Sequence, residues 1–102
     1  MEEKTLVEDE QTVFKRADNV EEIAFGKRFA LYRSGTERVV ILNKTGSLLW
    51  KQLESRQSTP ALIEHLQTQF PEVSKEQLES DVRAFLHELS SSCFVEAVAI
   101  DE

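Results

Sequence analysis

The fold of this chain is decided by residues 39–46, Val39-Val40-Ile41-Leu42-Asn43-Lys44-Thr45-Gly46. The first four residues are all apolar and predict a short strand. The next four interrupt that pattern, and the side chain of Asn43 or Thr45 can accept a hydrogen bond from an unpaired amide at the start of a helix. Three successive helical patterns follow as far as Val95. A strand that leads directly into three short helices is therefore the framework of the domain.

Three amphipathic helices are expected after this strand. The first begins at Asn43 or Thr45. The second has Thr59 as its N-cap and Pro60 at the first helical position, where the missing N–H of proline costs nothing. The third begins at Ser74 in a capping box, with a glutamine three residues later. The residues expected to face the core at helical spacing are Gly46, Leu49, Trp50, Leu53, Leu62, Ile63, Leu66, Phe70, Leu78, Val82, Phe85, Leu86 and Leu89.

Two more strands are expected before the first helix. Residues 20–25 and 28–33 flank Gly26-Lys27, a two-residue turn in which glycine can take a positive φ. Residues 38–42 return as the third strand of an antiparallel meander. A terminal strand at residues 94–100 is expected to cover part of the core or to pair at a sheet edge. The predicted fold class is α+β and winged-helix-like, with a three-stranded antiparallel sheet followed by three helices and a short C-terminal strand.

The chain has 102 residues, enough for one domain with one modest core. Residues 1–12 are expected to form a flexible acidic arm and residues 13–102 a single domain. The net charge is −7, but residues 11–57 are basic and residues 58–102 acidic. This distribution does not suggest a nucleic-acid surface of a single sign. No apolar run approaches the roughly 18 residues that a membrane helix needs, and no secretory signal pattern is present, so the expected location is the cytoplasm.

Neither catalysis, a metal site nor a cofactor is expected. His65, His87 and Cys93 do not place two ligands on one helical face. Cys93 is the only cysteine of the sequence and is predicted to be a buried, inert thiol. The three glycines are too widely spaced for a phosphate-binding loop.

Three motifs, taken in order, carry a family resemblance. They are Leu42-Asn43-x-Thr45-Gly46-x-x-Leu49-Trp50-x-x-Leu53, then Thr59-Pro60, then Asp81-Val82-x-x-Phe85-Leu86-x-x-Leu89. Together they resemble the PqqD family, the small domains also called RiPP recognition elements, from Phe14 to Val95. The sequence departs from the family pattern at Gly46, where alanine is more usual, and at Ser92-Cys93, which replace a glycine.

The resemblance implies a binding protein and not an enzyme. Such domains hold the leader of a ribosomally synthesised precursor peptide and present it to a modifying enzyme such as a radical SAM protein, a leader peptidase or a cyclase. In this family the third strand and the third helix border one groove. The peptide-binding residues that the resemblance implies are Arg38, Val39, Val40, Ile41, Leu42, Asn43, Asp81, Val82, Phe85, Leu86 and Leu89.

The third strand also carries a physical signal of its own. Residues 39–42 do not alternate between apolar and polar, so both faces of the strand require cover. One interpretation is that Val13 and Phe14, or the terminal strand, provide that cover internally. The other is that the strand is an edge whose unpaired N–H and C=O groups accept an extended peptide.

Two questions of charge remain open at this level. Arg33, Arg38 and Lys44 lie near the ends of the third strand, where they either steer an acidic leader segment or simply protect an exposed edge from aggregation. On the third helix, Asp81 and Glu88 lie on one side of the apolar stripe and Arg83 lies on the other. The side that faces the groove therefore decides which leader charge is favoured.

Two other classes of function compete with leader binding. Winged-helix domains often bind DNA through the third helix, but the acidic residues of that helix oppose phosphate binding. Those acids are Glu76, Glu79, Asp81 and Glu88, against Lys75 and Arg83. The second alternative is a protein interaction domain in which the exposed strand pairs with its own copy to form a homodimer.

Overall fold

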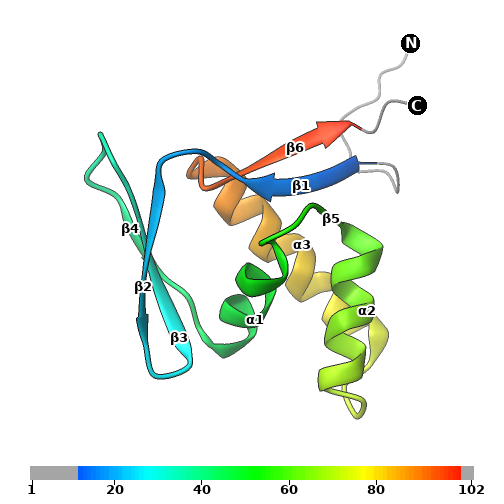
Figure 1. The fold of residues 1–102 in the computed structure, drawn as a ribbon. Coiled ribbons are helices and arrows are strands. Elements are labelled where there is room, and N and C mark those ends of the chain that lie inside the picture. Colours follow the sequence, from blue (N-terminus) through cyan, green and yellow to red (C-terminus); the bar gives the residue numbers. More distant parts are fainter. Residues whose placement is uncertain (1–11, 100–102) are drawn as a thin grey trace.

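The computed structural model describes residues 12–99, which fold into two small sheets and three helices (Figure 1). The elements in chain order are β1 (Thr12–Arg16), β2 (Val20–Phe25), β3 (Arg28–Arg33), β4 (Val39–Ile41), α1 (Lys44–Gln52), β5 (Gln57–Ser58), α2 (Thr59–Gln69), α3 (Lys75–Ser91) and β6 (Val95–Ala99). In Figure 1 the sheet of β2, β3 and β4 stands at one end of the molecule and α2 at the other, with α1 and α3 between them. The predicted α+β class is confirmed. None of the helices in the described part of the chain has the length and apolarity needed to cross a membrane.

The first sheet is the predicted antiparallel meander, in the order β2-β3-β4. Its register places Leu31 opposite Val40 and Ala30 opposite both Ile41 and Ile23. The turn between β2 and β3 contains Gly26 at a φ of 64°, as the two-residue turn requires. This sheet directs one face toward the helices and leaves the other face uncovered among the described residues.

The second sheet, in the order β5-β1-β6, was only partly anticipated. The terminal strand is present as β6 and pairs along its whole length with β1, from Thr12 opposite Ala99 to Arg16 opposite Val95. The sequence did not predict β1 or β5 as strands. Each pairs with a segment that is distant in the chain, so neither is marked by a hairpin pattern of two strands joined by a short turn. The predicted arm lies outside the described residues except for Thr12, which begins β1.

The core lies between the two sheets and the three helices. The buried cluster contains Phe14, Leu31, Leu42, Leu49, Trp50, Leu53, Leu62, Ile63, Leu66, Leu78, Val82, Phe85, Leu86, Leu89, Phe94 and Val95. Of the helical residues expected to face the core, Phe70 is only partly buried and packs against this cluster. Trp50 is 1% exposed, which confirms that it is a packing residue.

The N-terminal caps agree with the sequence at two helices and differ at the third. Asn43 caps α1, because its side-chain oxygen accepts a 2.7 Å hydrogen bond from the Gly46 amide. Ser74 caps α3 as predicted. The predicted cap of α2 is wrong by one residue, since Ser58 accepts the bond from the Ala61 amide and Thr59 is already helical. Ser58 ends the extended strand β5, and this conformation directs its hydroxyl toward the first helical turn.

The end of α3 corrects the prediction for Cys93, which is exposed and not buried. The Phe94 amide donates to the Leu89 carbonyl at 2.8 Å, and the Cys93 amide donates to the Ser90 carbonyl at 3.1 Å. These two bonds form a Schellman motif, in which the residue after the C-cap takes the left-handed conformation. Cys93 occupies that position at a φ of 66°. A cysteine therefore stands where the motif favours glycine, and its side chain lies outside the helix and the core.

Candidate functional site

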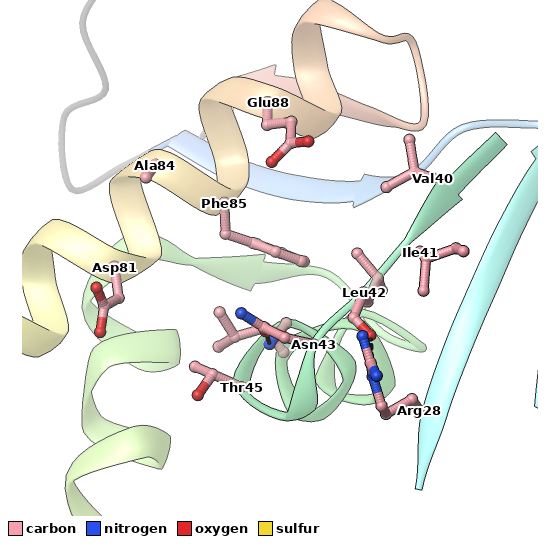
Figure 2. A pocket seen from close by; sticks show the side chains of 12 residues that line it. Arg28, Val40, Ile41, Leu42, Asn43, Thr45, Asp81, Ala84, Phe85 and Glu88 are labelled. Carbon is pink, nitrogen blue, oxygen red and sulfur yellow. Dashed lines mark hydrogen bonds between the residues drawn. The ribbon is translucent and has the colours of Figure 1, made fainter. Parts of the chain in front are cut away.

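A groove of about 350 Å³ opens between β4, the start of α1 and one face of α3 (Figure 2). The residues that line it are Arg28, Val40, Ile41, Leu42, Asn43, Thr45, Gly46, Leu49, Asp81, Ala84, Phe85 and Glu88. Its lining combines apolar side chains, among them Leu42, Leu49 and Phe85, with polar and charged ones, of which Arg28 and Glu88 are exposed. The groove is therefore suited to apolar side chains with polar or charged neighbours.

The edge of β4 that borders the groove is open. On the side of β3, the Leu42 amide donates to the Phe29 carbonyl at 2.8 Å. In an antiparallel ladder, residues alternate between bonding to the partner and pointing away from it, so Val40 also bonds to β3 while Val39 and Ile41 direct their N–H and C=O groups outward. Within residues 12–99, β4 pairs with β3 alone. The edge therefore offers donors and acceptors to an added strand.

Val13, Phe14 and the terminal strand do not pair with the open edge of β4. Those segments form β1 and β6, which pair with each other in the second sheet. Phe14 contributes instead to the main core, at 6% exposure. No described segment of the chain competes for the open edge of β4.

The end of β4 is held firmly against the start of α1. The Phe29 amide donates to the hydroxyl of Ser47, which is 2% exposed, and the Arg28 Nε donates to the Leu42 carbonyl at 2.9 Å. At Gly46, a Cβ atom would lie 3.3 Å from the capping oxygen of Asn43, so the glycine permits this close approach. These contacts fix the floor of the groove relative to the edge strand.

The second wall of the groove is one face of α3. Asp81, Ala84, Phe85 and Glu88 have the spacing i, i+3, i+4 and i+7 that places them in one row along a helix. In Figure 2 the ring of Phe85 and the carboxylate of Glu88 extend from α3 toward β4. The opposite flank carries Arg83, which pairs with Glu79 at 3.0 Å. The acidic flank of α3 therefore faces the groove, which answers the question that the sequence left open.

The structure separates the eleven predicted peptide-binding residues into three groups. Those that line the groove are Val40, Ile41, Leu42, Asn43, Asp81 and Phe85. Val82, Leu86 and Leu89 are at most 4% exposed and belong to the core cluster. Val39 lies on the open edge at 56% exposure, and Arg38 lies in the turn before β4, where its amide donates to the Thr36 hydroxyl.

Sequence reasoning missed six of the residues that line the groove. They are Arg28, Thr45, Gly46, Leu49, Ala84 and Glu88. A signal for Ala84 and Glu88 was present, because both share a helical row with Asp81 and Phe85. Apart from Asp81, the predicted residues of α3 were those of its apolar stripe, and that stripe mostly faces the core.

Comparison with known proteins places this geometry in context. The solved structure of TbiB1 in complex with the TbiA(beta) leader peptide matches with a TM-score of 0.75 at 23% identity, covering 84% of this chain and 99% of that chain. At this identity the match establishes a shared fold. The curated proteins include no match to the chain. The family model for coenzyme PQQ synthesis protein D (PqqD) matches residues 28–95, a range that holds every residue lining the groove, and the chain therefore belongs to the PqqD family.

Proposed function

We propose that this chain is a non-catalytic binder of a ribosomally synthesised precursor peptide. The leader of that peptide adds as a strand to the open edge of β4 and is presented to a separate modifying enzyme. The observation that carries the proposal is the outward-facing backbone of Val39 and Ile41 beside the groove between β4 and α3. The fold that this chain shares with TbiB1, which was solved with a leader peptide, supports the same conclusion.

The energetics assign different tasks to the edge and to the groove. Each backbone hydrogen bond of an added strand contributes about 0.5 to 1.5 kcal/mol, whereas ordering each ligand residue costs about 1 to 2 kcal/mol. These two free energies are of similar size, so backbone pairing alone contributes little net affinity. Burial of one leucine-sized side chain adds about 1.5 to 3 kcal/mol. The edge sets the register of the leader, and the groove supplies most of its affinity.

The proposed contacts follow from this division. Val39 and Ile41 pair with the leader through their backbone. Val40, Leu42 and Phe85 contact its apolar side chains, and Asn43 and Asp81 stand at the rim. Three core residues of α3 lie within one helical turn of Phe85 and belong to the same buried cluster: Val82, Leu86 and Leu89.

An amide-shift titration of the labelled protein with leader peptides encoded beside its gene tests the proposal. We expect shifts at residues 38–43 and 81–88, with micromolar or tighter binding. Peptides from the core regions of the same precursors serve as controls and are expected to leave these amides unchanged. The absence of shifts with every neighbouring leader would disprove the proposal.

A second candidate function is supported by the outer face of the first sheet. Five large apolar residues are exposed there: Ile23 at 62%, Phe25 at 44%, Tyr32 at 37%, Val39 at 56% and Ile41 at 59%. The register aligns them on one face, with Ile23 and Ile41 flanking Ala30, and with Tyr32 opposite Val39. A cluster of this kind marks an interaction surface. It favours association with another protein, including a second copy of this chain.

Sedimentation velocity over a range of concentrations tests self-association. If this face joins two copies, the dimer fraction rises with concentration, and Ile23→Lys abolishes the rise. Lys27→Glu, on the adjacent turn, is the control and is expected to leave the dimer intact. A monomer at every concentration would exclude the homodimer.

A further inference from the structure

The proposed leader site has two walls of different charge. The wall formed by α3 carries two carboxylates, Asp81 and Glu88, seven residues apart and therefore about 10 Å apart along the helix axis. The facing wall is largely neutral. Its one charged group, Arg28, already donates to the Leu42 carbonyl and lies 5.8 Å from the Phe25 ring.

The carboxylates of this wall lack cationic partners within the described residues. No Lys or Arg stands three or four residues from either Asp81 or Glu88, and neither forms an ion pair within residues 12–99. Asp81 accepts a hydrogen bond from the Gln77 amide side chain at 3.0 Å. On the other flank of α3, by contrast, Glu79 is paired with Arg83. On α3 the ion pair therefore involves Glu79, which faces away from the groove, and the two carboxylates of the groove side have no cationic partner among the described residues.

Basic residues elsewhere do not reverse this charge inside the groove. Arg33, at the end of β3, donates to the Cys93 carbonyl at 2.9 Å and does not line the groove. Arg38 and Lys44 also lie outside the lining. Any attraction they exert on an acidic leader segment acts at the ends of β4 and not between β4 and α3.

We infer that the leader carries a lysine or arginine whose side chain crosses the groove to Glu88, beside an apolar residue that packs on Phe85. This inference rests on the proposed function. Alternate residues of an added strand lie about 7 Å apart on the same face, so the basic and the apolar residue occupy positions i and i+2. The aliphatic stem of the base packs between Val40 and Phe85, and its charged head reaches Glu88. Asp81 stands at the other end of the wall (Figure 2).

Paired substitutions in the leader and the protein test this inference. The probes are ten-residue synthetic peptides tiled across the precursors encoded beside the gene, together with copies of the binding peptide in which each Lys or Arg is replaced by uncharged norleucine. Affinities are measured by fluorescence anisotropy with the full chain. We expect one norleucine replacement to weaken binding about tenfold. Glu88→Gln weakens the native peptide equally but leaves the affinity of that norleucine peptide unchanged.

Two further variants separate a direct contact from a general change in charge. Glu79→Gln removes a carboxylate from the far flank of α3 and is expected to leave affinity unchanged. Glu88→Lys is expected to bind best a peptide in which glutamate replaces the critical base. Equal affinity of native and norleucine peptides, or equal losses from Glu79→Gln and Glu88→Gln, would overturn the inference and leave the proposed function intact. Failure of every tiled peptide to bind would overturn both.

Discussion

The Nε1 of Trp50 donates a 2.6 Å hydrogen bond to the Oε1 of Glu22 and so ties α1 to β2. The Arg16 guanidinium lies 4.2 Å from the Trp50 ring centroid and 3.4 Å from the same Glu22 oxygen. Arg16 also donates to the Trp50 carbonyl at 2.7 Å. This cluster joins β1, β2 and α1, and therefore links the second sheet to the sheet that carries the open edge.

Glu22→Ala is expected to lower the free energy of unfolding by about 1 to 2 kcal/mol, because it leaves the buried indole N–H of Trp50 without its acceptor. Urea denaturation followed by the fluorescence of Trp50, the only tryptophan, measures the loss. Glu21→Ala removes a neighbouring exposed carboxylate and is the control. Equal stability of the two variants would contradict this role for Glu22.

Ile41→Pro is expected to weaken leader binding about tenfold, since it removes an outward N–H from the edge of β4. The ladder with β3 is preserved, because proline is tolerated on the free side of an edge strand. Ile41→Ala keeps the N–H and loses only side-chain area, so a smaller effect is expected. Titration of both variants with the same leader peptide provides the comparison. Equal affinities would argue against strand addition.

Ala84→Lys is expected to block the groove without harming the fold. Ala84 is exposed, lines the groove and lies four residues before Glu88, so the new ammonium group fills the space and pairs with that carboxylate. Leader affinity should fall at least about tenfold, while stability changes by less than about 0.5 kcal/mol. Ser80→Lys, an exposed position on α3 outside the groove lining, is the matched control. Similar losses of affinity in both variants would point to a nonspecific charge effect.

Cys93→Gly is expected to raise the free energy of unfolding by about 0.5 to 1 kcal/mol, because glycine takes the left-handed conformation of the Schellman motif without steric cost. Cys93→Val should have the opposite effect, since a β-branched residue is poorly suited to a positive φ. Thermal unfolding of the two variants under reducing conditions measures both changes. A less stable glycine variant would show that the thiol makes a contribution that the backbone does not explain.

The sequence was informative at several places where structure depends on neighbouring residues. The turn at Gly26-Lys27 predicts the meander, and Ser74 with its following turn predicts the start of α3. Strand β1 escaped detection because it pairs with segments that are distant in the chain. Cys93 was misjudged because its exposure depends on how α3 ends, and no glycine marks that end.

The candidate groove was predicted in location but not in detail. The apolar character of residues 39–42 and the motif from Asp81 onward indicated its two sides. The apolar stripe of α3, however, divides into a row that faces the core, with Val82 and Leu89, and a row that includes Phe85 and faces the groove. Only the rotation of α3 relative to β4 distinguishes these rows, and that rotation is set by tertiary packing.

The pairing of β1 with β6 has a consequence for how the domain is made. These strands are roughly eighty residues apart, so their pairing closes a loop that spans nearly the whole described chain. During synthesis, every residue of the groove leaves the ribosome before β6 does. The segments that line the groove therefore emerge together, whereas β1 can pair with β6 only after the C-terminal strand has emerged. Such distant pairing raises the contact order and slows folding, which makes closure of the second sheet the expected late step.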